Sequence, residues 1–232
     1  MNREARGPLW LALESSTPVA SVALGRANVL LGELLLGAEI RHAEALLPAI
    51  DQLLRLTGCP RTELAAIVVG GGPGSFTGLR IAAATAKGLV HALELPLFAY
   101  SGLLVVTATT GILGRPVCSM FDARRGEVYA ASYVVTDRTI DVVLSPAVLE
   151  LNQLLEMVPP ASTAFAGEGA VKHADEIRRR GGEVLPAHVG IPRASSLLWL
   201  AREHGALGRV ADPAHWQPEY LRASSAERGI SA

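Results

Sequence analysis

The apolar segments of this chain occur in the same order in its two halves, and this repetition limits the folds open to it. Each half begins with three short apolar stretches separated by turn residues. Amphipathic stretches, with apolar residues three and four apart, then alternate with further short apolar stretches. The short stretches predict strands and the amphipathic ones predict helices. Both halves of the 232 residues therefore predict the order βββαβαβα.

The expected elements can be placed along the chain to within a few residues. In the first half, the expected strands cover residues 9–14, 19–24, 29–36, 65–69 and 95–99, and the helices 42–57, 77–93 and 102–113. In the second half, the strands cover 117–121, 127–135, 139–144, 163–166 and 183–185, and the helices 146–158, 170–180 and 194–204. Pro146 would stand in the first turn of its helix, where the missing N–H of proline is tolerated.

This order of elements predicts an α/β fold with two lobes. Three hairpin-linked strands followed by helical crossovers produce a mixed sheet. Two lobes, each with a mixed five-stranded sheet, make up the duplicated ribonuclease H-like or actin-like (ASKHA) fold. We place the N-terminal lobe at 1–101 and the C-terminal lobe at 102–223, and expect the helix at about 194–204 to pack back toward the N-terminal lobe. Residues 224–232 are expected to form a disordered tail.

The composition favours a cytoplasmic protein with a sizeable core. Half of the residues are hydrophobic and 19% are charged. With 21 basic and 22 acidic side chains, the chain lacks the positive charge by which a protein grips nucleic acid alone. Two cysteines are too few for a disulfide framework. The uncharged stretch 95–114 contains a proline and three glycines, so we expect a buried strand and helix there rather than a membrane span.

A glycine-rich stretch at 70–74 stands where phosphate loops stand, between a strand and the start of a helix. It lacks the Gly-Lys-Ser/Thr of a P-loop, because Gly78 is followed by Leu79. The polar residues after the first strand are placed like the first phosphate loop of actin-like ATPases. The weak phosphate-loop-like candidates are Ser15, Ser16, Thr17, Gly74 and Ser75. Plain tight turns explain both stretches equally well.

Histidine spacing argues against a metal site. The chain has six histidines, and no two of them lie three or four residues apart, as a helical metal-binding pair requires. We therefore expect no catalytic residues, no metal and no cofactor of the chain's own. His42 opens an amphipathic helix and is interpreted as a surface or capping histidine.

Two helices of the first half carry more apolar surface than one sheet needs. If residues 47, 50 and 54 of the first helix face the sheet, Leu46 and Leu53 remain exposed. In the second helix, small residues four apart allow another helix to approach closely. The candidate partner interface consists of His42, Leu46, Leu53, Gly78, Ala82 and Ala86. Such exposed patches mark interfaces, and the same surface could also pair with itself in a homodimer.

Three stretches of the chain resemble a known family. They are HAEALLPAIDQLL (42–54), GGGPGSFTGLRIAAATAKGL (70–89) and DARRGEVYAASY (122–133), with shorter matches at LALESST and PEYLR (218–222). Together they resemble the bacterial TsaB family, also called YeaZ, over nearly the whole chain. Glu14 stands where the family commonly has Asp, which weakens any case for nucleotide chemistry there.

The resemblance implies a non-catalytic paralogue of the TsaD/Kae1 proteins. Those proteins transfer threonylcarbamoyl to N6 of adenosine 37 in tRNAs that read ANN codons. A TsaB-like chain would bind and activate TsaD through helices of its N-terminal lobe, with TsaE joining them. It would contact tRNA only indirectly, and ATP or ADP would belong to the complex with TsaD.

Two other classes stay open at this point. One is an independent enzyme, either an ATPase or an M22-type metallopeptidase, which metal analysis and a turnover assay would detect. The other is a homodimeric structural or regulatory module, whose removal would leave tRNA modification unchanged.

Overall fold

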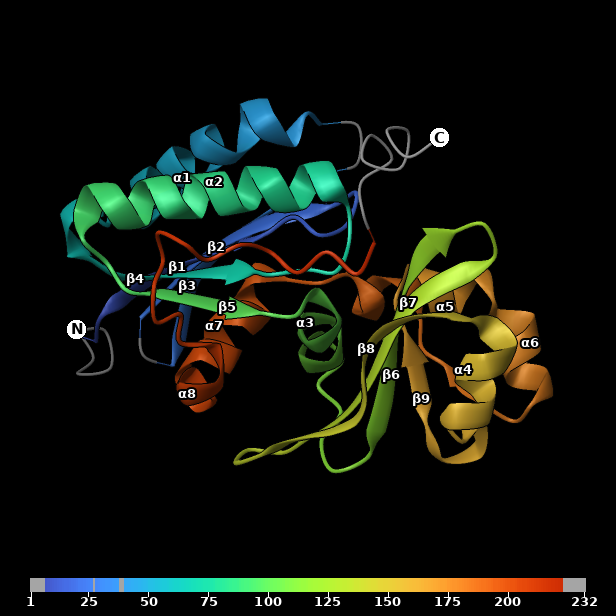
Figure 1. Ribbon diagram of the computed structural model, residues 1–232. Coiled ribbons are helices and arrows are strands. Elements are labelled where there is room, and N and C mark those ends of the chain that lie inside the picture. The colour runs from blue at the N-terminus through green and yellow to red at the C-terminus, as the bar shows by residue number, and fades with distance from the viewer. Residues whose placement is uncertain (1–6, 27, 38–39, 223–232) are drawn as a thin grey trace.

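The computed structural model describes residues 7–26, 28–37 and 40–222, and these form two lobes that each contain a mixed five-stranded sheet (Figure 1). The strand order is β3-β2-β1-β4-β5 in the N-terminal sheet and β10-β9-β6-β7-β8 in the C-terminal sheet. In both sheets the first three strands pair antiparallel and the last two add in parallel. The predicted duplication of a mixed five-stranded sheet is confirmed.

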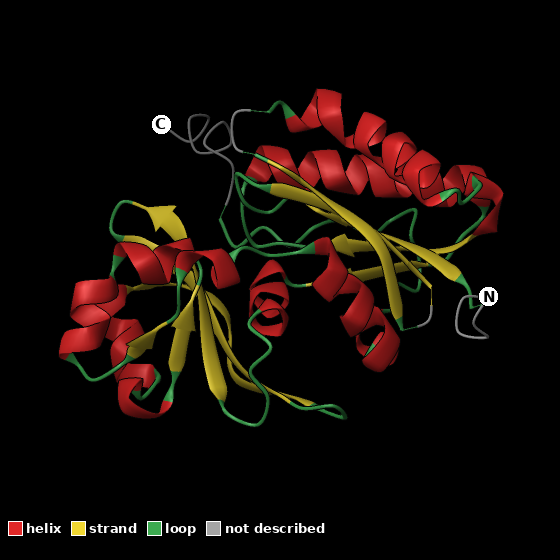
Figure 2. Cartoon of the chain, turned by 180° about the vertical axis from the view of Figure 1, so that it is seen from behind, coloured by secondary structure: helices red, strands yellow, loops and turns green. Residues whose placement is uncertain are grey.

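The N-terminal sheet is built from the first five strands. They are β1 (Leu9–Glu14), β2 (Ala20–Arg26), β3 (Val29–Leu36), β4 (Leu64–Gly70) and β5 (Leu97–Tyr100). The helices of this half are α1 (His42–Thr57), α2 (Phe76–Leu93) and α3 (Gly102–Thr109). Helices α1 and α2 lie side by side on one face of the sheet, and α3 and α7 lie on the other side (Figures 1 and 2).

The C-terminal sheet contains the remaining strands. They are β6 (Pro116–Arg124), β7 (Glu127–Val135), β8 (Ile140–Glu150), β9 (Ala164–Ala166) and β10 (Glu183–Val184). The helices are α4 (Leu151–Met157), α5 (Glu168–Lys172), α6 (Ala174–Arg179), α7 (Ala194–Glu203) and α8 (Gly205–Gly208). Among the described residues, no helix is both long enough and apolar enough to span a membrane.

The structure corrects two predicted helices of this half. Strand β8 continues through Pro146 to Glu150, so Pro146 does not stand in the first turn of a helix. Proline is tolerated there because β8 is an edge strand and its pairing with β7 is irregular at this point. Helix α4 begins only after Glu150, which forms a capping box with Gln153. The helix predicted over 170–180 is two short helices that meet at His173.

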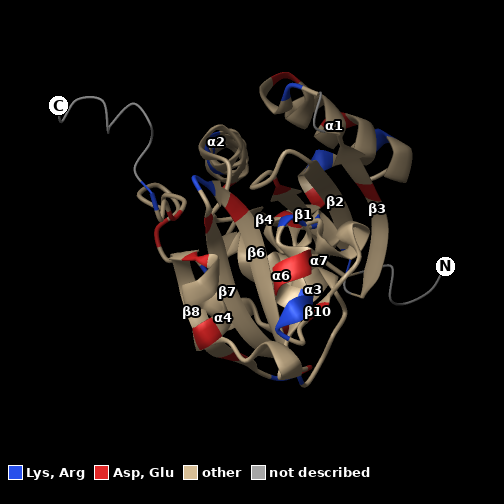
Figure 3. Cartoon of the chain, turned by 90° about the vertical axis from the view of Figure 1, so that its right-hand side faces the viewer, with Lys and Arg blue, Asp and Glu red and all other residues tan. Residues whose placement is uncertain are grey.

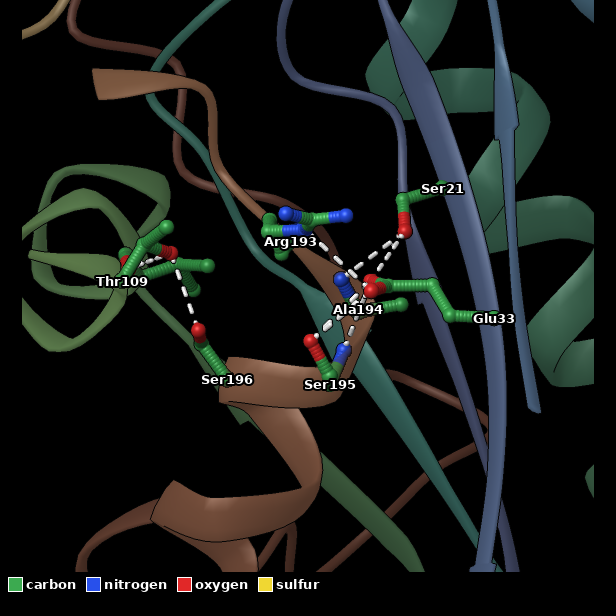
Figure 4. A network of polar contacts seen from close by, with 8 residues as sticks. Ser21, Glu33, Thr109, Arg193, Ala194, Ser195 and Ser196 are labelled. Carbon is green, nitrogen blue, oxygen red and sulfur yellow. Dashed lines mark hydrogen bonds and ion pairs between the residues drawn. The ribbon is translucent and has the colours of Figure 1, made fainter. Parts of the chain in front are cut away.

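Helix α7 joins the two lobes from below the N-terminal sheet. It packs against β1 and β2 of that sheet. The Glu33 carboxylate accepts hydrogen bonds from the main-chain N–H and the hydroxyl of Ser195 at 3.0–3.1 Å and pairs with Arg193 (Figure 4). On the other side, the Thr109 hydroxyl of α3 donates to Ser196 at 2.9 Å. A negative charge at the first turn of a helix favours that helix and fixes its position.

The hydrophobic core is continuous between the lobes. One cluster of buried side chains contains Val68 of β4, Leu104 of α3, Phe121 of β6 and Leu200 of α7. Two further clusters lie under α1 and α2 and under α4 and α5. The N-terminal sheet packs on α7 and the C-terminal sheet packs on α3, and these two helices pack against each other between the lobes.

The segment after α8 returns along the N-terminal lobe and ends at the C-terminal one. The N–H of Val210 donates to the carbonyl of Leu97 at 3.0 Å, and the N–H of Glu219 donates to that of Gly71 at 2.7 Å. Arg222 then donates to the carbonyl of Ala123. Residues 194–222 thus lie largely against the lobe placed at 1–101, and the tail predicted at 224–232 lies outside the described residues.

Candidate functional site

The two predicted phosphate-loop-like segments meet at the carboxyl ends of β1 and β4. Ser15, Ser16 and Thr17 form the turn after β1, and Gly74 and Ser75 lead into α2. The N–H of Ser75 donates to the carbonyl of Ser16 at 2.7 Å. Ser75 is the N-cap residue of α2, and its hydroxyl accepts from the N–H of Gly78. The topology therefore brings these residues together, as crossover connections of parallel strands do.

The close contact between these two segments leaves no space for a ligand between them. A Cβ atom at Gly74 would overlap the carbonyl of Ser16, and one at Gly78 would overlap the carbonyl of Ser15. Ser15, Ser16 and Thr17 are buried. The positive end of α2, which attracts anions in phosphate-binding loops, faces a main-chain carbonyl of the chain itself. Gly74 and Gly78 therefore allow two backbone segments to approach each other closely, and they do not make room for a phosphate.

Glu14, at the end of β1, is a fully buried carboxyl group. Its Oε1 accepts from the N–H of Ser16 at 2.6 Å, while Oε2 has no hydrogen-bond partner among the described residues. Gly70 provides the room, because a Cβ there would overlap this carboxyl group. Burial raises the pKa of Glu14, and the hydrogen bonds from Ser16 lower it to a smaller extent. The site favours the neutral acid, which is a poor ligand for a cation.

A serine and a histidine that are distant in sequence form a hydrogen bond next to this turn. The Ser15 hydroxyl lies 3.0 Å from Nδ1 of His42, and Nε2 of His42 lies 3.0 Å from the carbonyl of Pro18. Since a carbonyl only accepts, Nε2 carries the proton and Nδ1 accepts from the serine. Ser15 is 1% exposed, so it cannot meet a substrate as a nucleophile. The pair instead fixes the start of α1 on the β1–β2 turn.

The interpretation of His42 as a simple surface or capping residue is therefore incomplete. Its two partners are 24 and 27 residues away, and no local sequence pattern links them.

The exposure predicted for Leu46 and Leu53 is wrong. They are 1% and 2% exposed and pack in the core under α1, while Leu47 is 56% exposed. The leucines of this helix fit two overlapping stripes, and tertiary packing selects between them. Gly32 of β3 makes the space for Leu53, because a Cβ at Gly32 would come within 2.9 Å of a Leu53 methyl group.

The stripe Gly78, Ala82 and Ala86 is also buried, not exposed as predicted. Both alanines are 0% exposed and lie within the N-terminal lobe, facing its own sheet. Small residues are needed there because α2 approaches the β1–β2 turn closely at its first turn. The exposed alanines and glycines of α2 are Ala84, Gly88 and Ala92, and a Cβ added at Gly88 would meet no atom of the described residues within 4 Å.

The C-terminal lobe places charged residues at the equivalent position, around the β6–β7 hairpin. Asp122 pairs with Lys172 at 2.8 Å, and this lysine holds the pKa of Asp122 below its usual range. Burial raises the pKa of Glu168 at the start of α5. Among the residues that the structure describes, no three His, Cys, Asp or Glu side chains are grouped so that they could hold a metal ion.

The sequence is similar to proteins of tRNA threonylcarbamoyladenosine biosynthesis. The family model of TsaD, tRNA N6-adenosine threonylcarbamoyltransferase, matches residues 37–181. The tRNA threonylcarbamoyladenosine biosynthesis protein TsaB of Bacillus subtilis is 30% identical over 222 residues, which is 94% of this chain and 95% of that protein.

The fold has close and distant counterparts among solved structures. A crystal structure from Pseudomonas aeruginosa, of an uncharacterized protein with similarity to peptidase YeaZ, has a TM-score of 0.80 and 32% identity. The match covers 92% of this chain and 99% of that one. The ethanolamine utilization protein EutJ of Carboxydothermus hydrogenoformans matches 87% of this chain and 92% of its own with a TM-score of 0.51 and 12% identity, a likeness of fold alone. The chain thus has the predicted duplicated actin-like α/β fold.

Proposed function

Because the chain belongs to the TsaB/YeaZ family, we propose that it is a non-catalytic subunit required to form threonylcarbamoyladenosine at position 37 of tRNAs that read ANN codons. In this role it binds and activates a TsaD-type catalytic subunit, together with TsaE. It works in the cytoplasm and contacts tRNA only indirectly. ATP or ADP belongs to the complex with TsaD and not to this chain.

The observation that carries the non-catalytic assignment is the closed contact between the two phosphate-loop-like segments. The carbonyl of Ser16 accepts a hydrogen bond from the N–H of Ser75 at the start of α2, and Gly74 and Gly78 are packed against main-chain carbonyls. A nucleotide phosphate would have to displace this backbone contact.

The partner surface proposed here is the outer face of α1 and α2. Leu47 supplies an exposed apolar side chain on α1, and Ala84 and Gly88 allow a helix to approach α2 closely. Two helices from a related partner would complete a four-helix contact. The same face would be available for self-association when TsaD is absent, so the isolated chain can form a homodimer that competes with the complex.

The test is reconstitution with the cognate TsaD and TsaE. We expect threonylcarbamoyladenosine to form on a substrate tRNA only when this chain is present. Ala84→Arg, which places a long charged side chain on the exposed face of α2, should abolish TsaD binding and modification while the monomer stays folded. Val142→Arg, at an exposed apolar position on β8, is the matched control and should leave both unchanged. Modification that proceeds equally well without the chain would refute the proposal.

A second candidate function is that of an M22-type peptidase, which the description of the Pseudomonas structure favours. It predicts peptide hydrolysis by the isolated chain and a tightly bound metal. A metallopeptidase needs side chains that hold a metal ion, and the described residues contain no group of three His, Cys, Asp or Glu side chains placed to do so. Incubation of the isolated chain with a mixed peptide library, followed by mass spectrometry and metal analysis, separates the two candidates.

A further inference from the structure

The tip of the β6–β7 hairpin has an unusual backbone. Arg124, Arg125 and Gly126 follow one another with φ angles of 63°, 55° and 83°. Glycine adopts these left-handed angles readily, but an arginine is disfavoured there because its Cβ approaches the following carbonyl. Two successive arginines in this region are therefore maintained against a local cost.

The hairpin itself does not require arginine at these positions. Arg124 pairs with Glu127, so Arg125 and Gly126 form a two-residue turn. Such a turn needs positive φ at both central residues and favours Asn-Gly. Arg124 follows an irregularity in the pairing and donates its N–H to the Asp122 carboxylate at 2.9 Å. Asparagine would relieve strain at both positions, and strain of this kind is concentrated at functional positions.

Both arginine side chains are exposed, and neither guanidinium has a hydrogen bond or ion pair within the described part of the chain. The neighbouring charges, in contrast, are satisfied. Asp122 pairs with Lys172, and Glu127 pairs with Arg222. The hairpin tip therefore presents two exposed guanidinium groups, and that of Arg125 lines a surface pocket together with Glu150 and Glu176.

The segment before residue 222 holds this tip next to the start of α2. Arg222 donates to the carbonyl of Ala123 at 2.7 Å in the hairpin. Two residues earlier, the Tyr220 ring packs on Phe76 at the first residue of α2, with 5.1 Å between ring centroids. Figure 1 shows the β6–β7 hairpin rising toward this end of α2. The tip thus lies beside the N-terminal end of α2, which is one of the two helices that the proposed function assigns to TsaD.

We propose that Arg124 and Arg125 dock onto carboxylate side chains of the TsaD-type partner, as a second contact beside the α1–α2 face. This inference rests on the proposed function. Paired guanidinium groups match carboxylates by bidentate hydrogen bonds, and arginine is a frequent energetic centre of protein interfaces.

The charge distribution favours a protein partner over RNA. The chain as a whole carries a net charge of −1. In Figure 3, Lys and Arg are scattered among Asp and Glu, and they do not line up as a continuous basic stripe on the ribbon seen there. Binding to a phosphodiester backbone depends on such a stripe, whereas two cations suffice for a local acidic patch.

The test uses Arg124→Asn and Arg125→Asn in the full chain. Because asparagine relieves the left-handed strain, each variant should melt about 2–4 °C higher than the wild type. Each should also bind purified TsaD roughly tenfold more weakly by calorimetry, with the difference growing at low salt. Arg125→Lys keeps the charge and the strain but loses the bidentate geometry of the guanidinium, so its melting temperature should stay close to that of the wild type and its affinity should fall by less than that of Arg125→Asn. Arg138→Asn, at the exposed β7–β8 turn, is the matched control and should change neither property.

Three outcomes would overturn the inference. Asn variants that gain stability and bind TsaD like the wild type would remove the role of the arginines while leaving the proposed function intact. A loss confined to tRNA binding by the assembled complex, with unchanged TsaD affinity, would assign the arginines to RNA. Wild-type protein that does not bind TsaD at all would overturn the proposed function and this inference together.

Discussion

Glu14→Gln should stabilise this protein at neutral and alkaline pH. Glu14 is 0% exposed, its Oε2 has no hydrogen-bond partner among the described residues, and burial raises its pKa. A group whose pKa is higher in the folded than in the unfolded state supports folding fully below the unfolded value, which is 4.5 here. That support is lost as the pH rises through the folded pKa. Glutamine has the shape of the neutral acid and does not ionise, so it avoids this loss.

The size of the effect follows from the charge on the unpaired oxygen, because the amide N–H groups of glutamine would be unpaired at the same place but carry no charge. A buried polar group without a partner costs about 1–3 kcal/mol, and more when it is charged. We therefore expect Glu14→Gln to raise the free energy of unfolding by about 1–3 kcal/mol at pH 8, with the advantage shrinking toward zero near pH 4. For a chain of this length, each kcal/mol corresponds to about 2–4 °C in the melting temperature.

The assay is thermal unfolding of both proteins from pH 4 to pH 8, with Glu33→Gln as the matched control. Glu33 is also a carboxylate of the N-terminal sheet, but it accepts bonds from Ser21 and Ser195 and pairs with Arg193. Its amide variant should lose about 1.5–3 kcal/mol, the opposite sign. A Glu14→Gln advantage that is absent, or that is equal at pH 5 and pH 8, would refute the account of a penalised buried carboxyl group.

Five further substitutions test the packing. Gly78→Ala should lower the free energy of unfolding by about 1–3 kcal/mol, because the added Cβ meets a main-chain carbonyl. Gly88→Ala in the same helix should raise it by about 0.5–1 kcal/mol, and denaturant titration measures both changes. Ala82→Arg buries an unpaired charge and should leave no soluble folded protein, while Leu47→Arg should give a normal circular dichroism spectrum. Tyr100→Phe removes hydroxyl bonds to two carbonyls near the end of α7 and should cost about 0.5–1.5 kcal/mol in the same titration.

The order of the elements could be predicted from the sequence because it rests on local patterns. Apolar residues spaced three and four apart predict α1, and in the structure that helix begins and ends at the predicted residues, His42 and Thr57. Alternation and turn residues likewise predict β3 at 29–36 and β7 at 127–135. The duplicated sheets then follow from rules of chain connection that do not depend on particular side chains.

The orientation of each helix could not be predicted in the same way. Leu46 and Leu47 both fit an amphipathic stripe, and α2 carries two stripes of small residues. Which stripe faces inward is decided by Gly32 opposite Leu53 and by the β1–β2 turn above Gly78, contacts between segments 21 and 63 residues apart. Since the candidate interface was inferred from the other choice, its residues were predicted on the wrong face.

The sequence by itself therefore determined the fold class, the place of the glycine loop and the family to which its motifs point. Only the tertiary structure decided that the loop is closed, that Oε2 of the buried Glu14 has no partner among the described residues, and that Ser15 meets His42. It also decided that Arg124 and Arg125 adopt left-handed angles, since these depend on an irregular register between β6 and β7. The local periodicity of apolar residues specifies which elements form. Burial and strand register depend on how distant elements pack, so they cannot be predicted from the spacing of residues along the chain.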